Sequence, residues 1–166
     1  INTIQLVLKN NENIINDKNL TINIDFENLS KKTIYSDESA IKRILQNILE
    51  TSIKLTDVGS ITIKADHPEM EIVEKCGAKI VSPAESRSYI RIAISDTGMG
   101  LAESELEGIF EPYTQLDKSN KKTIVRSITL GIAYTILKRM GGAIWVESEV
   151  MKGSTFYIII PLEKEI

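Results

Sequence analysis

Cysteine, histidine and aromatic residues are scarce in this sequence, and what the sequence lacks excludes some classes of protein. The single cysteine among 166 residues has no partner for an internal disulfide, which fits a reducing compartment. No apolar run approaches the ~20 residues that a membrane-spanning helix needs, and the chain shows no signal-peptide pattern. The net charge of −3 at pH 7, without a basic stripe, gives no reason to expect nucleic-acid binding.

Hydrophobic residues make up 42% of the chain and charged residues 26%, which is typical of a soluble globular domain with one core. Internal repeats and low-complexity linkers are missing, so we expect residues 1–166 to form one domain. The chain begins with Ile1 rather than Met, and we therefore expect it to be part of a longer protein.

Apolar residues at helical spacing predict four helices. The clearest one follows Ser36, Asp37 and Glu38, which offer an N-cap and first-turn acids, and runs to about Leu55. Its buried stripe is expected to consist of Ile41, Ile44, Leu45, Ile48, Leu49 and Ile53. The other helices are expected from Ile1 to about Asn19, from Ala102 to Ile109, and from Leu130 to Met140 before Gly141 and Gly142.

Strict alternation of apolar and polar residues predicts strands. They are expected at Leu20–Phe26, Ser60–Ala65 and Tyr89–Ser95, and as a closing hairpin of Ala143–Ser148 and Ser154–Pro161 that turns through Gly153. We expect a short extended piece at Thr33–Tyr35, a long loop at Asp66–Ser88 with room for a short strand at Lys79–Val81, and a mobile, irregular stretch from Glu111 to about Ile128. This order predicts an α+β fold, a two-layer sandwich of a mixed sheet covered on one face by helices.

Three polar residues of the long helix have a spacing that suggests chemistry. Asn47, Thr51 and Lys54 stand at i, i+4 and i+7, so they should share one face, opposite the apolar stripe. An amide, a hydroxyl and an ammonium group aligned in this way can hold phosphates and a hydrated cation. On their own, the same three residues are more often a plain solvated face.

A second polar segment, Asp96-Thr97-Gly98-Met99-Gly100, follows a predicted strand. Its carboxylate can accept a hydrogen bond from an exocyclic amine, and its glycines allow a tight turn with close backbone approach. Taken alone, it could be an ordinary turn. Two further segments are the proline-halted run Ile109–Tyr113 and the hairpin region Met140–Phe156.

In this order and spacing, the four segments closely resemble the catalytic and ATP-binding domain of sensor histidine kinases. These belong to the ATPase superfamily shared with gyrase, heat-shock protein 90 and the mismatch-repair ATPases. The resemblance covers nearly the whole chain. It implies that Ile44–Thr56 is the N box, that Asp96 with Gly98 and Gly100 is the G1 box whose aspartate contacts adenine, that Phe110–Tyr113 is the F box, and that residues 115–129 are the ATP lid.

The resemblance also implies ligands and partners. The ATP-binding residues would be Asn47, Thr51, Lys54, Asp96, Gly98, Gly100, Phe110 and Thr155, with Asn47 and Thr51 as ligands of Mg²⁺. The domain would act in the cytoplasm, within a parent protein that can be membrane-anchored. Its partners would be upstream dimerisation and phosphoacceptor helices and a response regulator.

The sequence departs from the family pattern at the metal position and in the lid. The N box usually reads Asn-X-X-X-Asn, and Thr51 occupies the second position here. The family pattern has three glycines in the lid. In an ungapped comparison their positions are occupied here by Val125, Ser127 and Thr129, and in a gapped comparison Gly131 corresponds to the last of the three. Because β-branched residues resist φ > 0, at least part of the usual phosphate cradle is lost.

Several functions are compatible with these departures. An active domain would bind Mg-ATP and transfer its γ-phosphate to a histidine upstream, because His67 lacks an acceptor-like flank and is expected to be an exposed loop residue. A hydrolase is disfavoured, because Asn47 stands where those branches place a glutamate base. The alternatives are a pseudokinase that serves as a binding or signal-transmission module, or a domain whose phosphate grip uses Lys121, Lys122 or Arg126 instead.

Overall fold

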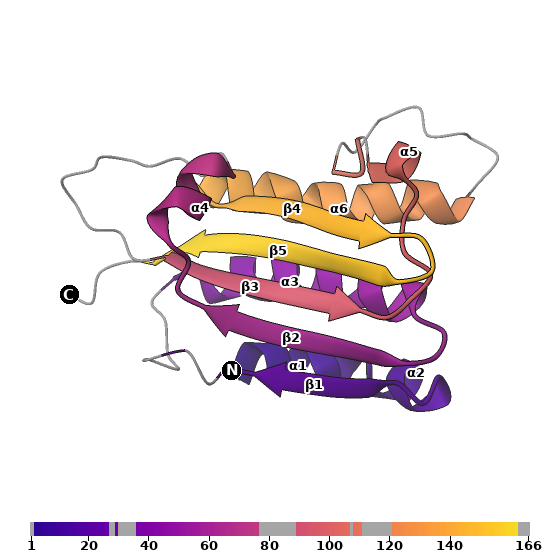
Figure 1. The fold of residues 1–166 in the computed structure, drawn as a ribbon. Helices are drawn as coiled ribbons and strands as arrows, with labels where there is room; N and C mark the ends of the chain where they lie inside the picture. Colours follow the sequence, from indigo (N-terminus) through magenta and orange to yellow (C-terminus); the bar gives the residue numbers. More distant parts are fainter. Residues whose placement is uncertain are drawn as a thin grey trace.

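The computed structural model describes residues 2–26, 29, 36–76, 89–106, 108–110 and 121–162, with side chains described outside 121–127. These residues form a sheet in the order β1-β2-β3-β5-β4 (Figure 1). The strands are β1 (Thr21–Asp25), β2 (Ser60–Asp66), β3 (Tyr89–Asp96), β4 (Ala143–Glu149) and β5 (Gly153–Pro161). β1 runs parallel to β2 and the other neighbours are antiparallel, so the sheet is mixed, as predicted.

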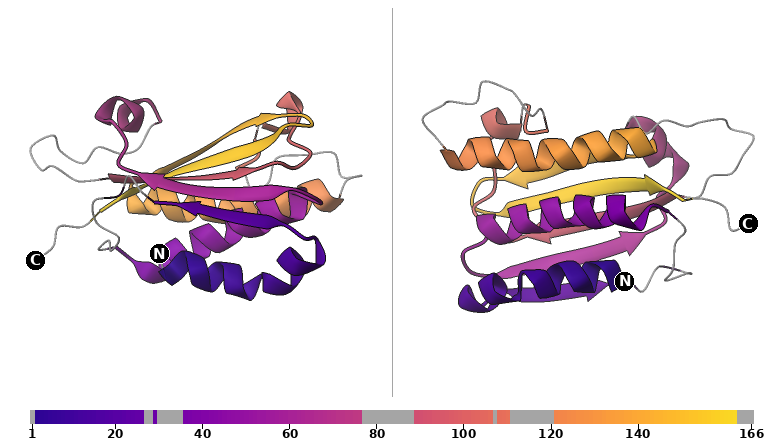
Figure 2. Two further views of the ribbon diagram at one scale, coloured as in Figure 1. Left: turned by 60° about the horizontal axis from the view of Figure 1, so that its bottom comes forward. Right: turned by 180° about the vertical axis from the view of Figure 1, so that it is seen from behind.

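Helices cover one face of this sheet, which confirms the predicted two layers (Figure 2). They are α1 (Asn2–Asn10), α2 (Glu12–Asp17), α3 (Glu38–Leu55) and α6 (Lys121–Met140). The short α5 (Glu103–Leu106) follows the turn after β3. No helix among the described residues combines the length and the apolar character needed to cross a membrane.

The long central helix α3 forms as predicted. The Asp37 side chain caps its first turn, with Oδ1 accepting from the Ala40 N–H at 3.0 Å. All six residues of the predicted stripe are buried. Because α3 packs against α1, α6 and β3, its burial fixes the position of the sheet relative to the helices.

The pleat of β3 decides which of its side chains can form a site beneath α3. Alternate residues Ile90, Ile92 and Ile94 are buried in the core between the sheet and the helices, and Asp96 follows them at the same period of two. The carboxylate of Asp96 therefore lies on the helix-covered side at the end of the strand. In the register of the sheet, Asp96 is opposite Ile61 of β2 and Ser154 of β5.

Some of the sequence predictions were wrong. The N-terminal helix is divided into α1 and α2 at Asn11, whose buried side chain donates to the Val7 carbonyl at 2.9 Å. The strand predicted at Leu20–Phe26 is shorter, at Thr21–Asp25, and because β1 lies at the sheet edge its Ile24 is 42% exposed. The stretch predicted to be irregular up to Ile128 is helical from Lys121 onward, because no glycine or proline interrupts residues 121–130.

The predicted loop after β2 contains a short helix, α4 (Met70–Lys75), on the face of the sheet opposite α1, α2, α3 and α6 (Figure 2). Its Val73 is fully buried in a small cluster with Tyr89, Ala143 and Ile159. Only one turn of this helix carries apolar residues, too few for the period to be visible in the sequence. The pieces predicted at Thr33–Tyr35 and Lys79–Val81 lie outside the described residues.

A lysine from outside α3 caps the C-terminal end of this helix. Lys18 Nζ donates to the carbonyls of Ile53 at 2.9 Å, Lys54 at 3.3 Å and Thr56 at 3.0 Å, and it pairs with Asp57 Oδ1 at 3.1 Å. The last carbonyls of a helix lack intrahelical partners and carry partial negative charge. The ammonium group therefore satisfies this helix end, directly beside the site described below.

We expect Lys18→Met to lower the free energy of unfolding by about 1–2 kcal/mol, because it leaves these carbonyls without their cationic partner. Urea denaturation followed by circular dichroism measures the change. The control is Lys75→Met, since the Lys75–Glu71 pair is exposed on both sides and should contribute little. Equal effects of the two substitutions would contradict a capping role for Lys18.

Candidate functional site

Asp96 is the buried charged centre of the site. Only 5% of its surface is exposed. Its Oδ1 accepts from the N–H of Gly98 at 3.0 Å and from the N–H of Ser154 at 3.3 Å. Its Oδ2 is buried and has no hydrogen-bond partner among the described residues. One oxygen therefore fixes the carboxylate, and the other remains available for a donor from a ligand.

Burial raises the pKa of Asp96 above its ordinary value, since a low-dielectric surrounding disfavours the charged form. The N–H groups of Gly98 and Ser154 act in the opposite direction, and so does the Ser52 hydroxyl. A ligand that donates a hydrogen bond to Oδ2 would add to these groups and favour the ionised carboxylate.

Two more buried polar atoms lack hydrogen-bond partners among the described residues, Asn47 Nδ2 and Ser52 Oγ, both on α3. Buried polar groups in folded proteins are nearly always paired, and an unpaired one calls for an explanation. With Asp96 Oδ2 they define an unpartnered polar set that comes from α3 and the end of β3. Two of the three atoms belong to residues that the sequence singled out.

The turn after Asp96 needs its glycines for close approach. A side chain at Gly98 would collide with the Leu55 carbonyl, which accepts from the Met99 N–H at 3.4 Å. Gly100 has φ +68°, and a side chain there would collide with the Glu149 carbonyl. The turn is thereby held between the C-terminal end of α3 and the turn that joins β4 to β5.

Residues 36–164 match the family of histidine kinase-, DNA gyrase B- and HSP90-like ATPases. The chain belongs to this ATPase family. The autoinducer 2 sensor kinase/phosphatase LuxQ of Vibrio vulnificus is 34% identical to it over 133 residues, which cover 79% of this chain and 14% of LuxQ. The chain thus spans only a small part of the relatives that it matches.

Solved structures of histidine kinases share the fold. Full-length ShkA in complex with AMPPNP has a TM-score of 0.74 at 22% identity, covering 99% of this chain and 30% of ShkA. ThkA in complex with the response regulator protein TrrA has a TM-score of 0.68 at 21% identity, covering 98% of this chain and 40% of ThkA. These likenesses and the family match confirm the fold class and the family predicted from sequence.

Within this ATPase domain, Asn47, Thr51 and Lys54 all belong to the continuous helix α3, so their spacing places them on one face, but they differ in burial. Thr51 is only 3% exposed, and its Oγ1 donates to the Asn47 carbonyl at 2.8 Å. Lys54 has 59% of its side chain exposed, with Glu50 Oε2 at 3.8 Å. α3 is in contact with other elements on several sides, so its buried arc is wider than the apolar stripe and includes Thr51.

The two predicted residues outside α3 and the Asp96 turn lie in different places. The Phe110 ring stacks on Tyr134 of α6, with 6.3 Å between ring centroids. Thr155 Oγ1 donates to Ser95 Oγ at 3.0 Å, on the face of the sheet opposite the Asp96 carboxylate. The structure therefore places the Thr155 side chain away from the Asp96 carboxylate, to which the Ser154 N–H donates.

Sequence reasoning missed Ser154 and Ser52. The alternation of β5 contained a signal for Ser154, because Phe156 is a core residue and Ser154 shares its face. Ser52 follows the i, i+4, i+8 positions of the buried stripe after Ile44 and Ile48, so its burial was also readable. The residues predicted as lid between 115 and 120 lie outside the described residues, and the remainder begins α6.

The protein atoms offer a poor ligand set for the Mg²⁺ that the family implies. Mg²⁺ prefers oxygen ligands, usually with one or two carboxylates. The described residues contain no group of three or more histidine, cysteine, aspartate or glutamate side chains that could hold a metal. Of the predicted ligands, Thr51 is buried and directed at its own helix backbone, which leaves Asn47 alone. The two residues do not fit a magnesium site held by the protein.

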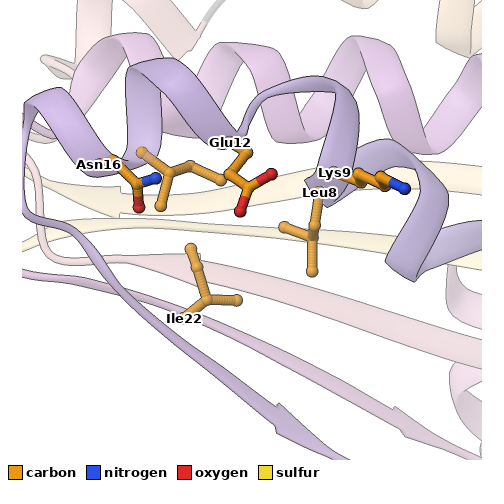
Figure 3. A pocket seen from close by; sticks show the side chains of 6 residues that line it. Leu8, Lys9, Glu12, Asn16 and Ile22 are labelled. Carbon is orange, nitrogen blue, oxygen red and sulfur yellow. The ribbon is translucent and has the colours of Figure 1, made fainter.

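A separate groove lies between α1, α2 and β1 (Figure 3). It has a volume of about 400 Å³ and is lined by Leu8, Lys9, Glu12, Ile15, Asn16 and Ile22. It includes none of the unpartnered polar atoms and none of the predicted site residues. The polar groups that could bind a ligand therefore lie around Asp96 and not in this groove.

The raised pKa of Asp96 predicts that Asp96→Asn makes the unliganded domain more stable at neutral pH. The folded state holds the proton more tightly than the unfolded state, so stability falls as the pH rises above about 4 and through the raised pKa. A neutral isostere avoids this loss. We expect the Tm to rise by about 1–4 °C at pH 7, with the difference narrowing toward pH 4.

Differential scanning fluorimetry across this pH range measures the difference. Asp17→Asn, at an exposed position of α2, serves as the control and should show no comparable pH-dependent gain. A lower Tm of Asp96→Asn at pH 7 would mean that the two backbone N–H bonds to the carboxylate outweigh its burial.

Proposed function

We propose that this domain binds ATP, with adenine held at Asp96, and donates the γ-phosphate to a histidine of a helical domain in a two-component sensor kinase. The observation that carries the proposal is the Asp96 carboxylate, which is buried, fixed through Oδ1 and unpartnered at Oδ2. The exocyclic amine of adenine is a donor of the kind that this oxygen lacks.

Each part of the site has a role in this mechanism. Asp96 Oδ2 accepts from the adenine amine, while Gly98 and Gly100 let the backbone approach the base. Asn47 Nδ2, a buried donor without a partner, donates to a phosphate oxygen, and the exposed Lys54 ammonium adds positive charge nearby. Phosphoryl transfer depends mainly on positioning and charge stabilisation, which such groups supply without covalent help.

The partners and the lid belong to the same proposal. LuxQ is named a sensor kinase/phosphatase, and ThkA was solved with a response regulator protein, which supports a response regulator as partner here. The phosphoacceptor and dimerisation helices would belong to the parent protein, with the domain in the cytoplasm where ATP is present. Residues 115–129 would be the ATP lid, of which the part from Lys121 onward is helical.

A pseudokinase is the second candidate, and two observations favour it. The backbone of α6 is helical where the family pattern has lid glycines, and the Thr51 hydroxyl bonds to its own helix. Such a domain would keep the adenine pocket and transmit binding without transfer. Incubating the parent protein with labelled ATP separates the candidates, because only an active kinase acquires acid-labile phosphohistidine.

We expect ADP to raise the Tm of the domain and Asp96→Asn to abolish that rise, because the substitution replaces the acceptor Oδ2 with a donor amide. At a concentration of about 100 times Kd, a ligand stabilises by about 2.7 kcal/mol, which gives a shift of several degrees. Fluorimetry with and without ADP measures it. The variant's own Tm shows that it is folded, and an unchanged ADP shift would reject Asp96 as the adenine contact.

The position of Thr51 predicts that Thr51→Val leaves the effect of Mg²⁺ on nucleotide binding unchanged. The hydroxyl is buried and bonded to the Asn47 carbonyl, so its loss removes no metal ligand. Titration of the ADP-dependent Tm shift in Mg²⁺ and in EDTA compares the two proteins. If the difference between the two conditions disappears in the variant, Thr51 is a ligand after all.

A further inference from the structure

The consecutive backbone carbonyls of residues 53–56, at the C-terminal end of α3, have two different partners. Three of them accept from Lys18 Nζ at 2.9–3.3 Å, the carbonyls of Ile53, Lys54 and Thr56. The Leu55 carbonyl accepts instead from the Met99 N–H at 3.4 Å. One ammonium group therefore fixes the carbonyls on both sides of the one that contacts the turn after Asp96.

Lys18 connects this helix end to the N-terminal part of the fold. It ends α2, and its own N–H donates to the Ile14 carbonyl at 3.1 Å. Its side chain is only 26% exposed, so solvent and salt screen its contacts less than those of a surface lysine. Lys18 precedes residues 36–164, which match the ATPase family, so the match itself assigns Lys18 no role.

The turn after Asp96 is held by α3 on one side and by β4 on the other. The Gly98 N–H donates to Asp96 Oδ1 at 3.0 Å, and a side chain at Gly98 would collide with the Leu55 carbonyl. On the other side, the Leu101 N–H donates to Ser148 Oγ of β4 at 2.8 Å. A displacement of the Leu55 carbonyl would therefore reach Gly98 and the Asp96 carboxylate, whereas Leu101 has a separate support.

The carbonyls at the end of a helix need partners from outside the helix. Without the ammonium group, they must be satisfied by water or by a tighter last turn. Either change alters the backbone on both sides of Leu55, and with it the direction of the Leu55 carbonyl. The contact that positions the turn after Asp96 thus depends on a cation that belongs to α2.

We propose that Lys18 is a positioning residue of the nucleotide site: its ammonium group holds the end of α3 so that the Leu55 carbonyl fixes the turn beside Asp96. This inference rests on the proposed function, because it assumes that ADP binds at Asp96. Lys18 acts through α3 and has no contact with the nucleotide. α2 is thereby coupled to the nucleotide site.

The first measurement is the Kd for ADP by isothermal titration calorimetry, at a temperature at which circular dichroism shows every variant to be folded. Lys18→Met should raise this Kd by about threefold or more, as expected for a residue that modulates binding without touching the ligand. Lys18→Arg should stay within about twofold of wild type, because a guanidinium group also offers several donors to the carbonyls.

Two control variants separate this role from the ion pair and from the loss of charge. Asp57→Asn removes the carboxylate that pairs with Lys18 and leaves the three carbonyl contacts, and the Asp57 side chain is 89% exposed. Lys75→Met removes the same charge from an exposed pair on α4. Both controls should bind ADP as wild type does, because exposed ion pairs contribute little.

The second measurement is the hydrogen exchange of two amides of the turn, followed by NMR without nucleotide. The Met99 amide bonds to α3, and the Leu101 amide bonds to β4. Lys18→Met should speed the exchange of Met99 relative to Leu101 by about threefold or more, because only the contact with α3 is loosened. A general loss of stability would speed the exchange of both amides alike.

The inference and the proposed function fail in different ways. A Lys18→Met protein with a lower Tm but an unchanged Kd, or with equal acceleration of both amides, overturns the inference and leaves Lys18 a helix cap alone. If wild type does not bind ADP, the proposed function fails and the inference fails with it. If Asp96→Asn abolishes binding and Lys18→Met leaves it unchanged, the proposed function stands alone.

Discussion

Close packing of the α3 C-terminal end against the turn after β3 determines the geometry of the site. The Leu55 carbonyl reaches the Met99 N–H only because residue 98 has no side chain to keep the two backbones apart. Lys18 satisfies the neighbouring carbonyls of the same helix end, so this end is held from two sides. With the helix and the turn fixed together, Ser52 of α3 and Asp96 at the end of β3 are both held in buried positions.

This arrangement lowers the stability of the unliganded domain. Buried polar atoms that lack partners each cost free energy, and here three of them come from α3 and the end of β3. Most of the surrounding buried residues are apolar, and Ile44, Ile48 and Ile94 are 0% exposed. Such a concentration of unmet hydrogen-bonding capacity is most simply explained by a ligand that supplies the missing partners.

Most of the fold and part of the candidate site could be predicted from the sequence. The period of α3 and the alternation of β3 and β5 were long enough to place the core, and the Asp96 turn is contiguous in sequence, so its glycines were readable. The burial of Thr51 could not be predicted from the sequence, because it depends on how many elements surround α3. The alternation of β5 indicated the face of Ser154, but its place opposite Asp96 required the register of the sheet, which depends on contacts distant in sequence. The start of α6 was missed because a glycine-poor, β-branched segment gives no clear helical period, although nothing in it stops a helix.

In the proposed function, recognition of the base and the grip on the phosphates depend on different parts of the chain. Asp96, Gly98 and Gly100 lie on the rigid sheet and on a turn packed against α3, where any side chain at either glycine would collide with a backbone carbonyl. That packing constrains this turn even without selection for catalysis. In the ungapped comparison Val125, Ser127 and Thr129 stand where the family has its lid glycines, and the backbone there belongs to α6. The glycines of the turn after Asp96 are therefore required by the packing of the fold itself, so the part of the chain that we propose to contact adenine is constrained by more than ligand binding.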